Sequence, residues 1–482
     1  MNFGLVPVTG KQAMNTSTRR KLIYLGGIIL LFIPIIALGL PAAPSHDVRE
    51  ASPGGKLAQL RLENNLGETS LGNVDPTSAT MNLVLLGLRG VATSILWKQA
   101  HDEQDVKNWA GLRATTDSII LLQPHFLKVW EFHGWNLAYN VAPEWDAVGD
   151  RYYWVKEGIK FKTRGVERNE RYPDLYYQTG IVVSQKIGLA DERKQYRRFF
   201  RDQDPDKATF PNGPDPAVKR VPGRADGENL NLNADNYEVG REWFKLAVQI
   251  NDKYPGHEQH ILAAPLFRAQ PTRTLSDYAI ALQDEGIFEE RTRRAWADAF
   301  EEWTTKYGKE EFPVLENSTP LHMELTPAEA QELSKTPAGR QTIEWIIRYQ
   351  DIVNYRYWRQ RCLAEQEPLT TEAHRDLYNG REKYFESHFG EATRFLLSGM
   401  AKLETMLKKH PEMYGDDSFT EEGLVAQVFW RSILKVEGER VPDKYPLQRM
   451  WESMPGMQQK ATELFHQYGR QRELERSLRE RN

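Results

Sequence analysis

The spacing of apolar residues limits most of this chain to one kind of secondary structure. From Met81 onward, apolar side chains recur every three or four residues, which places them on one face of an α-helix. No run of alternating apolar and polar residues is long enough to indicate a β-strand. The sequence therefore predicts an all-α fold after residue 81.

Residues 22–40 form a different kind of apolar segment. They read LIYLGGIILLFIPIIALGL, without a charge, and a helix of this length spans about 28 Å, which nearly matches a bilayer core. Arg19, Arg20 and Lys21 precede the run, and basic residues mark the cytoplasmic side of a spanning helix. We expect a single-pass transmembrane helix at 22–40, a cytoplasmic tail at 1–21 and the bulk of the chain on the extracytoplasmic side.

A cleaved secretory signal is the alternative interpretation of this segment. The sequence LPAAP at 40–44 supplies the small residues that a signal peptidase requires. The apolar region of a signal peptide is about 7–15 residues long, and this run is longer, which favours an uncleaved anchor. Both interpretations export the bulk of the chain.

Charge and cysteine content exclude several classes of function. Lys and Arg total 63 and Asp and Glu total 67, so the net charge of −4 provides no general attraction to nucleic acid. The single cysteine, Cys362, cannot form an internal disulfide, and it excludes Cys-cluster zinc sites and iron–sulfur clusters. We therefore expect no nucleic-acid partner.

Two segments interrupt the helical pattern. Residues 41–80 mix Pro, Gly, Ser and charges around a short amphipathic stretch, LAQLRLENNL, and are expected to be a tether with one small helix. Residues 201–235 gather Asp, Pro, Gly and Asn without periodicity and are expected to form a long loop. The region 256–482 is expected to add further helical pairs, at 272–306 with a break at Gly286, in one long helix at 338–364, at 371–409, at 421–435 and at 446–478, with a charged helix or tail from 471 to the end.

Helix pairs recur near a spacing of about 34 residues, which is the period of one common helical repeat. Within them a large residue precedes a small one by four positions, as in Trp130 with Gly134 and Tyr176 with Gly180. The intervening and following helices carry small or apolar residues at matching offsets, namely Gly158, Gly165, Gly240, Phe244 and Ala247. Small residues let two helices approach closely while a ring fills the space beside them. This pattern resembles the tetratricopeptide repeat (TPR).

The resemblance covers about a third of the chain and implies a TPR-like α-solenoid at 81–255 with the loop 201–235 inserted in it. In that family the concave wall binds an extended peptide or apolar segment of a partner protein. The positions that match this wall are Trp97, His101, Glu131, Trp135, Tyr139, Tyr177 and Ile181. The resemblance thus implies a membrane-anchored scaffold that mediates protein–protein interaction.

Motifs for chemistry are incomplete in this sequence. Asp202, Asp204 and Asp206 alternate as in a calcium loop, but the sixth position is Lys207 and the twelfth is Gly213, which the loop does not allow. The histidines of His-Glu-Gln-His at 257–260 are three residues apart, whereas a zinc helix needs four. Phosphate-binding Gly-rich loops, nucleophile elbows and dinucleotide fingerprints do not occur. We predict no catalytic residue, no metal ion and no cofactor, and a neutral, buried or half-buried thiol at Cys362.

Two alternative functions remain open at this point. One is an exported all-helical enzyme of unknown reaction, which a cluster of Asp, Glu or His facing one cavity would favour. The other is a structural envelope component that forms homo-oligomers through the last helices, 421–478. Fold alone does not decide among these alternatives and the scaffold.

Overall fold

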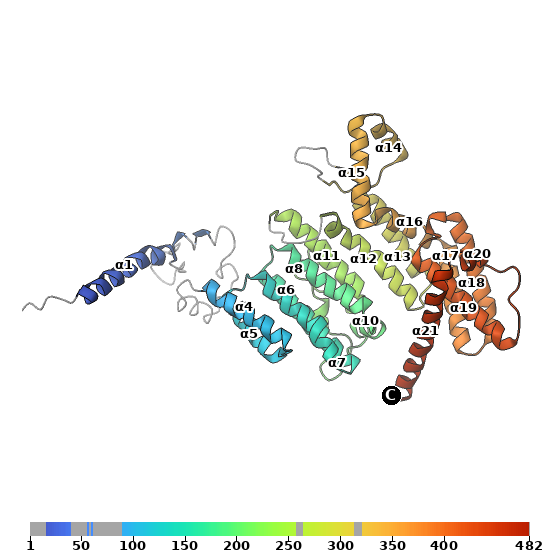
Figure 1. Cartoon of the computed structure of the whole chain (residues 1–482), viewed down its shortest axis with the longest axis horizontal. Helices are drawn as coiled ribbons and strands as arrows, with labels where there is room; N and C mark the ends of the chain where they lie inside the picture. Colours follow the sequence, from blue (N-terminus) through green and yellow to red (C-terminus); the bar gives the residue numbers. More distant parts are fainter. Residues whose placement is uncertain are drawn as a thin grey trace, which may run out of the picture. The chain divides into compact units, whose positions relative to one another are not determined.

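The computed structural model describes residues 16–39, 55–56, 59–60, 89–256, 264–312 and 321–481. Within these ranges it consists of helices and two isolated β-bridges, Arg220–Asn229 and Phe312–Leu321, and contains no strand (Figure 1). The predicted all-α fold is therefore confirmed. The chain divides into two compact units, residues 1–126 and residues 127–482, which are described separately.

The first unit contains α1 (Thr16–Gly39), α4 (Arg89–Asp105) and α5 (Trp109–Leu122). Helices α4 and α5 pack against each other as a hairpin. Asn108 caps α5 by accepting a hydrogen bond from the backbone N–H of Gly111 at 3.2 Å, and Leu112 and Ile119 are buried. The hairpin therefore has its own N-cap and its own buried face.

Helix α1 covers the predicted transmembrane segment except for Leu40, which lies outside the described residues. In the described part of the chain, no helix combines the length and the apolar character that a membrane span requires. The predicted tether, 41–80, also lies outside the described residues except for 55–56 and 59–60.

The second unit begins with helices that pack in sequence order (Figure 1). These are α6 (Leu127–Asn136), α7 (Val148–Arg168), α8 (Pro173–Ile181), α9 (Ile187–Leu189), α10 (Arg193–Arg201), α11 (Asn236–Lys253), α12 (Ala264–Asp284) and α13 (Glu290–Glu301). Three of them continue into π-helical turns: α6 into η2 (Leu137–Val141), α8 into η4 (Val182–Lys186) and α13 into η6 (Glu302–Lys306). Short 3₁₀ turns lie at η3 (Ala142–Glu144), η5 (Pro216–Lys219) and η7 (Tyr307–Lys309).

Glycines lie where these helices cross. A Cβ atom on Gly165 of α7 would lie 2.9 Å from the Trp130 ring of α6, and one on Gly180 of α8 would lie 2.8 Å from the Phe244 ring of α11. Both distances are too short for a side chain, so each crossing requires glycine. Gly165 and Gly180 thus lie at close helix crossings, as predicted, but each faces a ring on the neighbouring helix and not one on its own helix. Gly134, predicted to act with Trp130, faces the Lys162 side chain of α7.

The long loop between α10 and α11 is folded against the helices. Lys156 of α7 is buried and forms ion pairs with two carboxylates of the loop, Asp204 at 2.5 Å and Asp215 at 3.6 Å. Lys160, one turn along α7, pairs with Asp215 at 2.8 Å. At the end of the loop, Asp235 caps α11. Ion pairs therefore attach the predicted loop 201–235 to α7.

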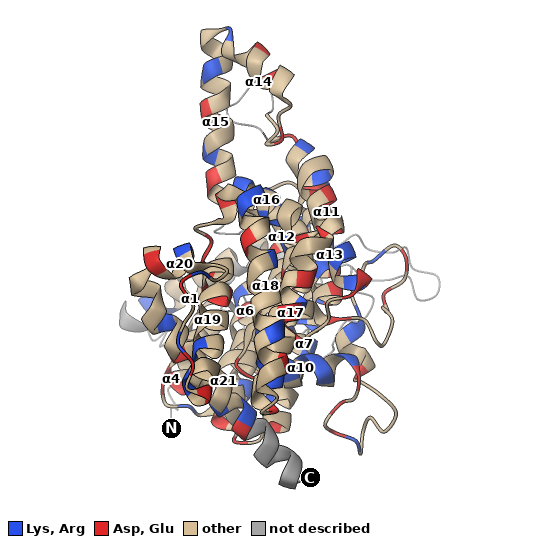
Figure 2. Cartoon of the chain, turned by 90° about the vertical axis from the view of Figure 1, so that its right-hand side faces the viewer, with Lys and Arg blue, Asp and Glu red and all other residues tan. Residues whose placement is uncertain are grey.

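The remaining helices are α14 (Pro327–Ser334), α15 (Pro337–Val353), α16 (Tyr355–Glu365), α17 (Pro368–Phe385), α18 (Phe389–Lys409), α19 (Asp417–Glu437), α20 (Gln448–Ser453) and α21 (Pro455–Arg481), with a 3₁₀ turn η8 (Pro411–Met413). Helices α14 and α15 form a hairpin that stands out from the other helices of this unit, and α15 carries charges of both signs along its length (Figures 1 and 2).

The prediction of one long helix at 338–364 is wrong. The helix ends at Asn354, which has the left-handed backbone angles φ 52° and ψ 40° and separates α15 from α16. Asparagine tolerates this conformation better than most residues, and a single such residue ends a helix. The break redirects the chain, so that α16 packs against α13 and α17.

Candidate functional site

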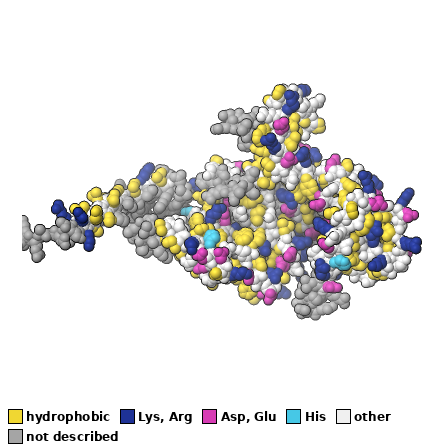
Figure 3. All heavy atoms as spheres, viewed as in Figure 1, with side chains coloured by type: hydrophobic (Ala, Val, Ile, Leu, Met, Phe, Trp, Pro, Cys, Tyr) yellow, Lys and Arg dark blue, Asp and Glu magenta, His cyan; other side chains and the backbone are white. Residues whose placement is uncertain are grey.

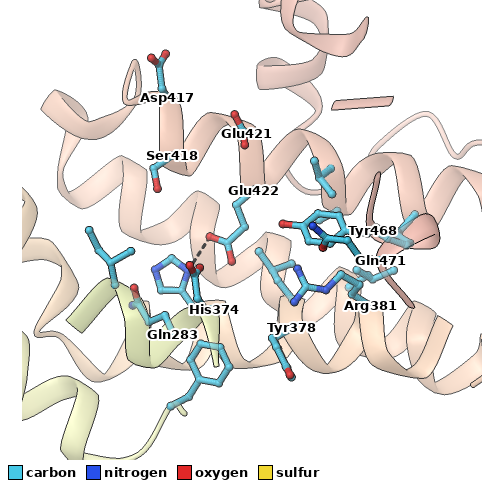
Figure 4. Close-up of a pocket in the computed structure, with 18 of the residues that line it drawn as sticks. Gln283, His374, Tyr378, Arg381, Asp417, Ser418, Glu421, Glu422, Tyr468 and Gln471 are labelled. Carbon is cyan, nitrogen blue, oxygen red and sulfur yellow. Dashed lines mark hydrogen bonds and ion pairs between the residues drawn. The ribbon is translucent and has the colours of Figure 1, made fainter. Parts of the chain in front are cut away.

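The second unit contains a cavity of about 460 Å³ lined by residues of α10, α12, α16, α17, α18, α19 and α21. One face of α17 contributes His374, Tyr378 and Arg381, which are four and three residues apart and therefore point the same way. Helix α19 contributes Ser418 and Glu422 in the same manner, and Figure 4 shows the Glu422 side chain directed toward His374. We call this space the α17–α19 cavity.

His374 joins three helices at the wall of this cavity. Its Nε2 atom lies 3.0 Å from Glu365 of α16, and its Nδ1 atom lies 2.6 Å from Glu422 of α19 (Figure 4). Glu365 is fully buried, whereas the side chain of Glu422 is 31 % exposed. The imidazole thus bridges a buried carboxylate and one that borders the cavity.

The electrostatics of this cluster favour the charged forms of His374 and Glu365. Burial alone lowers the pKa of His374, but Glu422 and Glu365 outweigh it and raise this pKa well above its ordinary value of 6.5. Burial raises the pKa of Glu365, but His374, Arg361 and a hydrogen bond from Gln283 outweigh it, so the net shift is downward. An imidazolium held between two carboxylates is the form that this geometry stabilises.

Arg361 supports the cluster from α16. Its guanidinium donates hydrogen bonds to the hydroxyl groups of Tyr357 at 2.8 Å and Ser418 at 3.1 Å, and its Nε atom lies 3.5 Å from Glu365. Because Arg361 is buried, these contacts use its donors inside the protein. Arg361 therefore fixes α16 to α19 and is not free to bind a ligand.

Arg381 has a different environment. The centre of its guanidinium lies 4.9 Å from the ring centre of Tyr378 and 4.4 Å from that of Tyr468 on α21. Among the residues that the structure describes, no hydrogen-bond acceptor or carboxylate is in contact with it. Two aromatic rings thus flank a cation that borders the α17–α19 cavity.

Two other carboxylates at the cavity have basic partners. Asp284 lies 3.5 Å from Arg193, and Glu421 lies 2.7 Å from Lys460. Apolar side chains complete the lining, namely Ile280, Phe288, Leu377, Leu396, Val425, Ala426 and Phe429. The cavity combines fixed charges, aromatic rings and aliphatic surface, as ligand sites commonly do.

The predicted groove residues of the first unit lie on α4. The rings of Trp97 and His101 are in edge-to-face contact, with their centres 4.7 Å apart, and Nδ1 of His101 lies 2.9 Å from the backbone oxygen of Trp97. The two side chains therefore contact each other on one face of the helix.

The other predicted groove residues, in the second unit, have mixed environments. Trp135 is 44 % exposed and stacks on Tyr139 with ring centres 5.3 Å apart, so these two rings form a small aromatic surface. Glu131 pairs with Lys128 at 2.7 Å. Ile181 is half-buried.

The prediction that Tyr177 lines an open groove is wrong. Its ring is buried and lies between Phe244 of α11 and Phe267 of α12, with ring centres 5.2 Å and 4.9 Å away. The side chain fills space between helices and does not line an open wall. Within the second unit, Tyr177 therefore does not line a groove with the other predicted residues.

The acidic residues of the calcium-like triplet point to different partners. Asp202 pairs with Arg201, Asp204 with the buried Lys156, and Asp206 accepts a hydrogen bond from the backbone of Thr209. The histidines at 257–260 lie outside the described residues. Within the described ranges, no three His, Cys, Asp or Glu side chains are placed to hold a metal ion.

Cys362 is buried on α16, as predicted. Burial raises the pKa of its thiol to about 12, and its sulfur lies 3.5 Å from the Ser276 hydroxyl. A thiol in this environment is a poor nucleophile.

The sequence alone did not identify Glu365, His374, Arg381 or Glu422. The spacing of His374, Tyr378 and Arg381 does place them on one helical face, but a polar face is usually solvated. Only the packing of α16 and α19 against α17 brings the carboxylates to the imidazole. Comparison with protein-family models finds no match, and comparisons with curated proteins and with solved structures find no significant similarity.

Proposed function

We propose that this chain is a membrane-anchored, TPR-like scaffold that binds a segment of a partner protein on the extracytoplasmic side. The α17–α19 cavity is its binding site. The observation that carries this proposal is the lining of the cavity, where aliphatic side chains, two tyrosines and fixed charges surround about 460 Å³. Such a lining suits a polypeptide segment with both polar and apolar side chains.

The anchor of this proposal is the segment 22–40. Its support is the composition of α1, where large aliphatic side chains such as Leu22, Ile23 and Leu31 are exposed. Figure 3 shows hydrophobic side chains along α1 and basic side chains at its N-terminal end. A lipid environment is the natural partner of such a surface, and the basic end agrees with a cytoplasmic N-terminus.

The repeat architecture is supported by the glycine contacts at the crossings of α6 with α7 and of α8 with α11. Each helix pair buries its apolar face against its neighbours, and the array presents its outer faces to solvent. Helical arrays of this kind commonly bind other proteins.

The test is to block the cavity without removing core side chains. Gln471 is exposed on α21 and lines the cavity, so Gln471→Trp would fill its entrance. Gln459→Trp is the matched control, because Gln459 is exposed on the same helix and does not line the cavity. We expect crosslinking in native membranes, followed by purification of the full chain, to lose a partner with Gln471→Trp and to keep it with Gln459→Trp. Equal recovery with both variants would reject the cavity as the binding site.

A second candidate function, an enzyme, is favoured by the Glu365–His374–Glu422 cluster. Titratable groups with shifted pKa values at a cavity are a common feature of active sites. In this role Glu422, held by His374, would accept a proton from a ligand in the cavity. The test is turnover of ester and amide substrates by the purified full-length chain. Turnover that is lost in Glu422→Gln and kept in Glu421→Gln would support this candidate over the scaffold.

A further inference from the structure

Arg381 differs from the other basic residues at the α17–α19 cavity in what surrounds it. Arg361 donates to Tyr357 and Ser418, and Arg193 lies 3.5 Å from Asp284. In the described part of the chain, Arg381 makes no hydrogen bond or ion pair, and its guanidinium lies beside the rings of Tyr378 and Tyr468. Its N–H donors therefore remain available at the cavity.

The two rings also restrict the direction from which an acceptor can approach. A guanidinium is planar and its N–H groups point outward in its own plane. The rings of Tyr378 and Tyr468 lie 4.9 Å and 4.4 Å from the centre of this guanidinium. They block approach from their own directions and stabilise its charge. A ligand group that is itself planar and accepts two parallel hydrogen bonds matches the remaining edge, and a carboxylate has this geometry.

Resting on the proposed function, we infer that Arg381 binds a carboxylate of the partner segment, and that an apolar residue adjoins this acidic one. The apolar neighbour is placed by the aliphatic and aromatic lining, which includes Leu377, Val425 and Phe429 on the helices that flank Arg381. The ligand class is thus a peptide in which Glu or Asp adjoins Phe or Leu.

The other charges at the cavity favour a carboxylate over a phosphate. Glu421, Glu422 and Asp284 already border this space, each with one basic partner, and Asp417 lies away from Arg381 along α19 (Figure 4). One unpaired guanidinium balances a single negative charge, whereas a phosphate group carries nearly two and would be repelled by these carboxylates.

The experiment uses the purified full-length chain in detergent micelles and a set of short, capped, fluorescent peptides. The peptides share one frame and differ at its centre, which is Glu-Phe, Gln-Phe or phosphoserine-Phe. We expect the Glu-Phe peptide to bind most tightly in an anisotropy titration. Arg381→Gln should weaken this binding about tenfold to a hundredfold, as expected for the loss of a charge-assisted hydrogen bond, and should leave the weak Gln-Phe binding unchanged.

Two further variants control for folding and for simple charge. Arg394→Gln removes an exposed arginine on α18, outside the cavity, and should not change binding. Arg381→Lys keeps the charge but loses the planar pair of donors, so it should recover only part of the affinity. Equal binding by Arg381→Gln and the unmodified chain, tighter binding of the phosphoserine peptide, or no binding of any peptide would overturn the inference. If Gln471→Trp still abolishes partner recovery in membranes, the proposed function survives such a failure.

Discussion

Lys156 and His374 are two of the buried basic residues that the structure describes, and each lies between two carboxylates. Comparing their surroundings separates a structural role from a site. Lys156 lies between Asp204 and Asp215, and all three side chains are at most 2 % exposed. His374 lies between Glu365 and Glu422, but Glu422 borders the α17–α19 cavity. The same arrangement of charge is sealed in the first case and open to a ligand in the second.

The sealed cluster joins two distant parts of the chain. It fastens the loop 201–235 to α7, and a closed environment strengthens the attraction between its members. The open cluster joins α16, α17 and α19 and also exposes one carboxylate to the cavity. A buried ion pair is therefore not evidence of function by itself, and the adjoining cavity is what distinguishes the second cluster.

The largest effect is expected for Lys156→Met. This change leaves Asp204 and Asp215 buried without their shared cation, which should reduce the free energy of unfolding by about 3–5 kcal/mol. Urea denaturation measures this loss, and hydrogen exchange should show reduced protection in 201–235. Lys160→Met, which removes a partly exposed partner of Asp215, should cost less. If the two variants are equally stable, the sealed cluster does not hold the loop.

His374→Gln should have a smaller effect, because Gln283 and Arg361 still contact Glu365 and because Glu422 reaches solvent. We expect a loss of about 1–3 kcal/mol, the cost of leaving one buried polar group poorly satisfied. Urea denaturation at pH 6 measures it, with Glu421→Gln as a control at the same cavity. A loss as large as that of Lys156→Met would mean that the second cluster is also chiefly structural.

Gly180→Ala tests the packing of α8 against α11 and changes no charge. The added Cβ would lie 2.8 Å from the Phe244 ring, so the helices must shift at a cost of about 1–2 kcal/mol. Gly390→Ala on α18, where nothing lies within 4 Å of the new Cβ, should be neutral or slightly stabilising. Thermal unfolding of the two variants measures the difference, and equal melting temperatures would argue against close helix contact at Gly180.

The smallest expected effect is on the pH dependence of stability. The raised pKa of His374 means that its contribution is complete below about pH 6.5 and is lost as pH rises through the folded-state pKa. The lowered pKa of Glu365 means that its contribution is complete above about pH 4.5 and is lost as pH falls through its own folded-state pKa. The stability gap between the unmodified chain and His374→Gln should therefore narrow as pH rises above 6.5 through the folded-state pKa of His374.

Denaturation curves at three pH values above 6.5 would establish the trend. The cost of Gly180→Ala serves as the control, because it arises from packing and should stay constant over the same pH range. A gap for His374→Gln that stays constant or widens would show that the imidazole does not carry the charge assigned to it.

Local patterns in the sequence were sufficient for the helices and for part of their packing. Apolar periodicity predicted the all-α fold, and Gly180 was expected at a close helix crossing because small residues recur at fixed offsets from rings. The break at Asn354 was missed because the apolar pattern continues through it. One residue in the left-handed conformation changes the direction of the chain but does not interrupt the spacing of apolar residues in the sequence.

The candidate site depends on contacts that periodicity does not encode. Glu365, His374 and Glu422 belong to three helices, and which faces of those helices meet is decided by tertiary packing. Tyr177 is a second case in which tertiary packing decided the outcome. The resemblance assigned it to an open wall, but its ring lies between Phe244 and Phe267. The resemblance to the tetratricopeptide repeat stays a prediction, since it rests on spacing alone.

The π-helical turns η2, η4 and η6 affect how positions in this chain correspond to any repeat template. Each such turn holds about one more residue than an α-helical turn, so side chains beyond it are rotated by about 100° relative to an uninterrupted helix. Tyr139 lies within η2, and Ile181 directly precedes η4. A register that is correct at the start of α6 or α8 is therefore off by one position at its end, and any numbering scheme carried along these helices must insert a gap at Leu137 and at Val182.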